Sequence, residues 1–157
     1  QIVCRDDSFG KAGLLIVFTC NHCPYAIALW RRLIQLSNQI KLKGIHTLAI
    51  NPNINPNYPE DSPQNMKSLV DSMGLPFPYL IDSDQSVARL YEAQCTPDIY
   101  LLNHEKQCVY HGRFDDNWQD ESQVSSMDLF DAVENMLVGQ TIQQAVPSMG
   151  CSIKWNE

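Results

Sequence analysis

The chain has 157 residues, of which 44% are hydrophobic and 18% charged, proportions that are ordinary for a protein with one hydrophobic core. Its net charge of −7 argues against a nucleic-acid partner, because binding to a phosphate backbone needs an excess of Lys and Arg. No apolar run approaches the roughly 20 residues needed to span a bilayer. We therefore expect one domain over residues 1–157, with 140–157 as a C-terminal tail.

Strand and helix patterns alternate along the chain, which indicates an α/β protein. Continuous apolar runs predict buried strands, and apolar residues three and four positions apart predict helices. The expected elements, in chain order, are a strand at 14–18, a helix at 24–42, a strand at 45–50, a helix at 62–74, a strand at 77–81, a short helix around 87–91, a hairpin with strands at 99–102 and 108–111, and a helix at 126–138. The order requires a parallel crossover followed by antiparallel strands, so it predicts a mixed sheet with helices on both faces.

The sequence Cys20-Asn21-His22-Cys23 follows the first predicted strand and directly precedes Pro24, the expected first residue of a helix. A CxxC pair in this place is typical of thiol–disulfide chemistry, because free N–H groups at a helix start favour a thiolate. Half of a zinc site is the alternative, since CxxC pairs also occur in zinc ribbons. No second CxxC and no HxxxH motif accompanies this one, which favours redox chemistry.

Four stretches of the chain resemble one known family. They are Phe18-Thr19-Cys20-Asn21-His22-Cys23-Pro24-Tyr25, Tyr58-Pro59-Glu60-Asp61-Ser62-Pro63, Cys95-Thr96-Pro97-Asp98 with Gly112-Arg113-Phe114-Asp115-Asp116-Asn117, and Gly150-Cys151-Ser152-Ile153-Lys154-Trp155. With these stretches the chain resembles the thioredoxin superfamily in its peroxiredoxin-like branch, the AhpC/TSA or redoxin group, and within it thioredoxin-like proteins with a CNHCP motif. The resemblance implies a thioredoxin-like fold with a peroxiredoxin-type αβ insertion and a C-terminal tail.

The resemblance also implies a second part of the site, at Thr96-Pro97. These residues resemble the cis-proline loop of the thioredoxin fold, so Pro97 is expected to be cis and to lie beside the CxxC pair. In that fold the residue before the proline, here Thr96, offers backbone hydrogen bonds to an incoming peptide. Cys95 would then be a third thiol near the pair, and Cys151 in the tail a fourth. The alternative for both is a small buried apolar residue.

The chain also departs from the family patterns. Cys23 falls where the thioredoxin nucleophile lies, and its partner has moved upstream to Cys20, the position of the peroxiredoxin threonine. The thioredoxin buried carboxylate would fall near Val17, so no acid is expected there to accept a proton. The arginine expected in peroxiredoxins is not evident, which weakens the case for a peroxidase. The helix-start argument favours Cys23 as the nucleophile, and Cys20 remains the alternative.

The remaining charged residues and histidines are assigned either to the thiol site or to the solvent-exposed surface. A protonated His22 between the two sulfurs would favour a thiolate, and an exposed loop histidine is the alternative. The acids Glu60-Asp61 and Asp115-Asp116 are expected to be solvated or capping residues, in loops that by the resemblance border the active site. Arg31 and Arg32 are expected to lie on a solvated helix face. Cys4 and Cys108 are interpreted as structural.

The favoured prediction is a thiol–disulfide oxidoreductase with an antioxidant or redox-homeostasis role. Its catalytic residues would be Cys20, Cys23, His22 and Pro97, with Thr96 and Cys95 contacting the substrate. The partners would be protein thiols or disulfides and an unidentified reductant or oxidant, with no organic cofactor. A thiol peroxidase, a copper or zinc protein binding through the CxxC pair, and a redox-inactive interaction module are the alternatives. A cytoplasmic location is expected, and a periplasmic or secreted one stays open if an N-terminal signal was removed.

Overall fold

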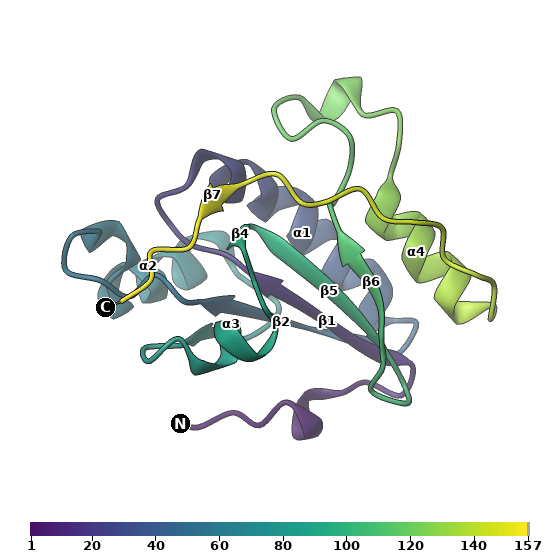
Figure 1. Cartoon of the computed structure of the whole chain (residues 1–157), viewed down its shortest axis with the longest axis horizontal. Coiled ribbons are helices and arrows are strands. Elements are labelled where there is room, and N and C mark those ends of the chain that lie inside the picture. The colour runs from purple at the N-terminus through teal and green to yellow at the C-terminus, as the bar shows by residue number, and fades with distance from the viewer. Residues whose placement is uncertain (157) are drawn as a thin grey trace.

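The structure, a computed structural model, describes residues 1–156 and is built around a five-stranded mixed sheet (Figure 1). In spatial order its strands are β3 (Tyr79–Ile81), β2 (Ile45–Asn51), β1 (Gly13–Phe18), β5 (Asp98–Asn103) and β6 (Cys108–Gly112). The pairs β1–β2 and β2–β3 are parallel, whereas β1–β5 and β5–β6 are antiparallel. The predicted mixed sheet is confirmed.

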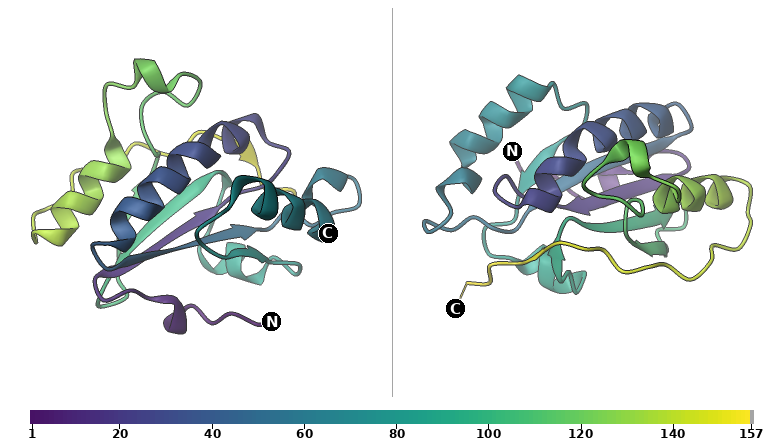
Figure 2. Two further views of the ribbon diagram at one scale, coloured as in Figure 1. Left: turned by 180° about the vertical axis from the view of Figure 1, so that it is seen from behind. Right: turned by 90° about the horizontal axis from the view of Figure 1, so that it is seen from above.

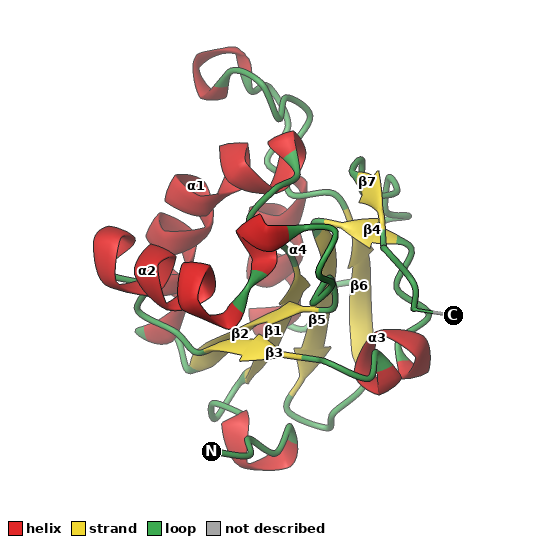
Figure 3. Ribbon diagram, turned by 90° about the vertical axis from the view of Figure 1, so that its left-hand side faces the viewer, coloured by secondary structure: helices red, strands yellow, loops and turns green. Residues whose placement is uncertain are grey.

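Helices cover both faces of this sheet, as expected (Figure 3). The helices are α1 (Pro24–Lys41), α2 (Pro63–Met73), α3 (Ser86–Leu90) and α4 (Asp128–Leu137). Side chains of α1, α2 and α4 pack into one core cluster, and α3 packs into a second cluster on the opposite face. The two views of Figure 2 show α1 and α4 side by side on the same face of the sheet.

The central strand β1 consists of a continuous apolar run because both of its faces are buried. Leu15 and Val17 point into the cluster beneath α1, while Leu14, Ile16 and Phe18 point into the cluster beneath α3. Every residue of β1 is buried. A strand covered on both faces has no polar side, which is why the alternation of a half-exposed strand is absent from its sequence.

Helix α2 has well-defined ends. The Ser62 Oγ accepts a hydrogen bond from the Asn65 N–H, Pro63 is the first helical residue, and Gly74 ends the helix with φ of +62°. A hydroxyl cap satisfies one of the free N–H groups of the first turn, and glycine adopts the left-handed conformation without strain. The predicted boundaries at 62 and 74 therefore agree with the observed helix.

Several details of the predicted elements were wrong. The strand expected at 77–81 begins only at Tyr79, and a 3-10 turn, η2 (Pro59–Asp61), lies between β2 and α2. The helix expected at 126–138 spans 128–137.

The sequence patterns also missed a second, two-stranded sheet. It pairs β4 (Cys95–Thr96) with β7 (Cys151–Ser152) in antiparallel register. The C-terminal segment thus runs back across the molecule to reach β4 (Figure 1). Among the described residues, no helix is both long and apolar enough to cross a membrane.

Candidate active site

Both cysteines of the CxxC pair lie at the point where β1 passes into α1. Cys23 is the N-cap residue of α1, and Cys20 follows the end of β1 by two residues. Neither side chain is exposed to solvent. The pair therefore occupies the helix start that the sequence predicted, but beneath the surface rather than on it.

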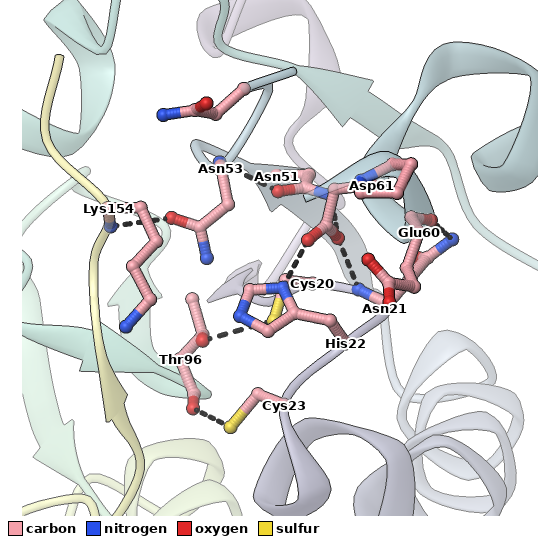
Figure 4. Close-up of polar contacts among 12 residues, drawn as sticks. Cys20, Asn21, His22, Cys23, Asn51, Asn53, Glu60, Asp61, Thr96 and Lys154 are labelled. Carbon is pink, nitrogen blue, oxygen red and sulfur yellow. Dashed lines mark hydrogen bonds and ion pairs between the residues drawn. The ribbon is translucent and has the colours of Figure 1, made fainter. Parts of the chain in front are cut away.

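Thr96 contacts both sulfurs, as Figure 4 shows. Its Oγ1 lies 3.3 Å from the Cys20 Sγ, and its carbonyl oxygen lies 3.2 Å from the Cys23 Sγ. The antiparallel pairing of β1 with β5 sets Phe18 opposite Asp98, which brings the preceding Thr96 to the CxxC pair. The Thr96–Pro97 peptide bond is cis.

An aromatic pocket adjoins Pro97. Tyr25, Phe114 and Trp118 line it together with tail residues from Val146 to Met149. The rings of Tyr25 and Trp118 pack with centroids 4.1 Å apart. Pro97 itself forms part of the lining of this pocket.

The buried acid of the site is Asp61, which we expected to be solvated. Its side chain is fully buried, and its Oδ1 accepts hydrogen bonds from the Asn21 N–H at 2.6 Å and the Asn51 Nδ2 at 2.9 Å. The 3-10 turn η2, which follows β2 in the chain, contains Asp61 and places it beside the CxxC loop. The expectation was wrong because partners distant in sequence replace the water around this carboxylate.

His22 forms a hydrogen bond with that acid. Its Nδ1 faces the Asp61 Oδ2, and its ring stacks on Tyr58 with centroids 4.7 Å apart. Because an ionised carboxylate only accepts hydrogen bonds, the Nδ1 carries the hydrogen in this contact. Asp61 thus orients the imidazole, which lies close to Cys20 (Figure 4).

The pKa values of the two thiols are shifted in opposite directions. A hydrogen bond from the Cys20 thiol lowers the pKa of Cys23 to about 4, against the effect of burial, and smaller contributions come from Cys151 and the Ala26 N–H. The same interaction raises the pKa of Cys20 well above its usual range, and burial adds to this effect. The directions of the two shifts favour the negative charge on Cys23 and the proton on Cys20.

Two further cysteines lie near the pair. Cys151 packs against the buried cluster of Cys20, Cys23 and Ala26. Cys95 is half-buried, with its Sγ 3.5 Å from the Pro97 carbonyl oxygen, and burial raises its pKa to about 12. Cys4 and Cys108, interpreted as structural, are both exposed.

Arg32 also departs from the expectation of a solvated helix face. It is buried, its Nη1 lies 2.5 Å from the Asp115 Oδ2, and its Nη2 donates to the Trp118 carbonyl at 2.7 Å. Asp115 is thus a buried ion-pair partner rather than a solvated acid. The pair holds the loop that places Trp118 over Tyr25.

One group of side chains near the pair has the spacing of metal ligands. Ligand atoms of Cys20, His22 and Asp61 all lie within 4.8 Å of one another. This set differs from the predicted one, because Asp61 rather than Cys23 completes it. Thiolate and imidazole suit zinc and copper.

The fold and the thiol site define a thioredoxin-like protein. The AhpC/TSA family model matches residues 3–111, and the chain belongs to this family, in the redoxin branch of the thioredoxin superfamily. Among curated proteins, none matches the chain. Family and fold together support a redox role for the protein.

Three solved structures illustrate the similarity. An uncharacterized conserved protein from Geobacillus kaustophilus is 40% identical, with a TM-score of 0.93 over 99% of this chain and 84% of that one. A hypothetical protein from Sinorhizobium meliloti 1021 is 36% identical, with a TM-score of 0.89 over 96% and 84%. The thioredoxin domain of a thiol-disulfide oxidoreductase from Bacteroides vulgatus is 19% identical, with a TM-score of 0.63 over 86% and 85%, and shares the fold.

Proposed function

We propose that the protein is a thiol–disulfide oxidoreductase that uses Cys23 as nucleophile and Cys20 as resolving cysteine. The observation that carries this proposal is the geometry of the pair: Cys23 is the N-cap residue of α1, and Thr96, beside the cis-Pro97, contacts both buried sulfurs. The low pKa of Cys23 agrees with its role as nucleophile. A thiolate, rather than a thiol, attacks disulfides. The substrate class is a disulfide on another protein.

The reaction balances as two exchanges. The Cys23 thiolate attacks one sulfur of the substrate disulfide, the other sulfur leaves as a thiolate, and a mixed disulfide forms. Cys20 then loses its proton and attacks the Cys23 sulfur, which releases the substrate's second thiolate. The substrate gains two electrons, and Cys20 and Cys23 end as a disulfide that a partner reductant must reduce.

The second exchange requires a base, because the pKa of Cys20 is raised. His22 and Asp61 supply it. Their ligand atoms lie within 4.8 Å of the Cys20 sulfur, and Asp61 orients the ring. The imidazole accepts the Cys20 proton as the bond to Cys23 forms.

The test is the redox equilibrium of the pair against glutathione, followed by alkylation and mass spectrometry. We expect one two-electron transition, which both Cys20→Ser and Cys23→Ser abolish and the exposed control Cys108→Ser leaves intact. Absence of a Cys20–Cys23 disulfide at every potential would contradict the proposal. Reduction of insulin disulfides by the reduced protein measures the exchange activity itself.

Two alternatives have their own supporting observations. Membership of the AhpC/TSA family favours a thiol peroxidase using Cys23, which peroxide consumption tests. The cluster of Cys20, His22 and Asp61 favours zinc or copper binding, which metal content after chelator-free purification tests. A cytoplasmic location remains a proposal from the sequence alone.

A further inference from the structure

The tail strand β7 covers the thiol pair. Thr96, which contacts both sulfurs, pairs directly with Cys151 across the two-stranded sheet. The sulfurs of Cys20 and Cys23 have no solvent exposure with the tail in this position. A partner protein must therefore displace or replace this strand before its disulfide can reach Cys23.

The sequence of the tail fits this placement closely. A Cβ atom on Gly150 would lie 2.3 Å from the Thr96 carbonyl oxygen, so only glycine allows the tail to approach the backbone at Pro97. Beyond Cys151, Ile153 is buried in the core beneath α3, and the Lys154 N–H donates to the Asn53 Oδ1 at 2.9 Å. Contacts on both sides thus hold Cys151 at the pair.

Cys151 faces the sulfur that carries the negative charge. Its side chain packs against the cluster that contains Cys20 and Cys23. Hydrogen bonds from both its thiol and its backbone N–H contribute to lowering the pKa of Cys23. Burial and the contact with Cys23 raise the pKa of Cys151 to about 11, so it is held as a thiol beside a thiolate.

We propose that β7 is an internal substrate strand: it occupies the edge of β4 that a partner strand would use, and Cys151 exchanges disulfides with Cys23. Addition of an extended segment to a free strand edge is a common mode of peptide recognition. Here the segment belongs to the chain itself. The inference rests on the proposed thiol–disulfide exchange and extends it to a third cysteine.

The exchange needs no external oxidant. In the oxidised protein, the Cys151 sulfur attacks the Cys23 sulfur, the Cys20–Cys23 bond breaks, and Cys20 leaves with the electron pair and takes up the proton that Cys151 loses. The Cys23–Cys151 disulfide replaces the Cys20–Cys23 disulfide with no net oxidation. External substrates then compete with the tail for the same sulfur.

The first test uses Cys20→Ser treated with oxidised glutathione. Cys23 attacks the reagent and releases one glutathione, and Cys151 then attacks Cys23 and releases the second. We expect a Cys23–Cys151 disulfide as the main product in peptide mapping under non-reducing conditions. A stable Cys23–glutathione adduct, or a bond from Cys23 to Cys95, would overturn the inference.

The second test removes the close approach of the tail. Gly150→Ala should raise the alkylation rate of Cys23 by about tenfold, because local opening controls the access of reagents to buried groups. Gln144→Ala, at an exposed position of the same tail, is the matched control and should leave the rate unchanged. An unchanged rate in Gly150→Ala would show that β7 does not close the site.

The two proposals fail in different ways. A Cys20–Cys23 disulfide in the unmodified protein, without any Cys23–Cys151 product in Cys20→Ser, leaves the proposed function and overturns only the role of the tail. A Cys23 that does not react with oxidised glutathione in any variant overturns both.

Discussion

Replacing Cys20 by alanine removes the largest contribution to the low pKa of Cys23. That pKa lies at about 4 chiefly because the Cys20 thiol donates a hydrogen bond to the Cys23 sulfur. A hydrogen bond to a charged group contributes about 1.5–3 kcal/mol, and one pKa unit corresponds to about 1.4 kcal/mol. We therefore expect Cys20→Ala to raise the pKa of Cys23 to between about 5 and 6.

The matched control is Cys20→Ser, since its hydroxyl group can still donate a hydrogen bond to the Cys23 sulfur. The assay is the pH dependence of iodoacetamide modification of Cys23 in the reduced protein, followed by mass spectrometry. Only the thiolate reacts, so the rate falls as the pH drops through the pKa of Cys23, and this fall begins at higher pH in Cys20→Ala. Identical profiles for the alanine, serine and unmodified proteins would refute the idea that Cys20 stabilises the thiolate.

Two further substitutions test buried charges. Asp61→Asn should slow the resolution of a mixed disulfide on Cys23 by about 100-fold in stopped-flow measurements, because His22 loses the acid that orients it. The control Glu60→Gln changes the exposed neighbouring acid and should leave this rate unchanged. Arg32→Gln should lower the free energy of unfolding by about 3–5 kcal/mol in urea titrations, because it leaves the Asp115 carboxylate buried and unpaired. Arg31→Gln, on the exposed side of α1, should change it by less than about 0.5 kcal/mol.

The fold was largely predictable because local patterns and burial agree along most of the chain. The apolar run of β1 is long enough to identify a strand covered on both faces, and Ser62, Pro63 and Gly74 mark the ends of α2 by their own side-chain and backbone chemistry. The small sheet of β4 and β7 was not predictable. Each of its strands has only two residues, so no periodic pattern exists to detect.

The site was predictable in part. The CxxC spacing and the following Pro24 identified the thiols, and the resemblance identified Thr96-Pro97. Asp61 was missed because an acid in a loop rich in Asn and Pro is usually solvated. Its burial depends on Asn21 and Asn51, which lie 40 and 10 residues away in the sequence and reach it only in the folded chain. Local context cannot report such a contact.

This missed acid bears on the question that the sequence left open, which cysteine attacks. The hydrogen bond to Cys23 and burial are the main causes that raise the pKa of Cys20, and the nearby charge of Asp61 adds a smaller effect in the same direction. Cys20 therefore keeps its proton and donates a hydrogen bond to Cys23, whose position at the start of α1 also favours negative charge. The helix start lowers the pKa of Cys23, and Asp61 raises the pKa of Cys20. Both effects favour the negative charge on Cys23. The proposed role of Cys23 as nucleophile thus rests chiefly on the CxxC pair and its helix start, and a carboxylate outside the motif adds a smaller effect.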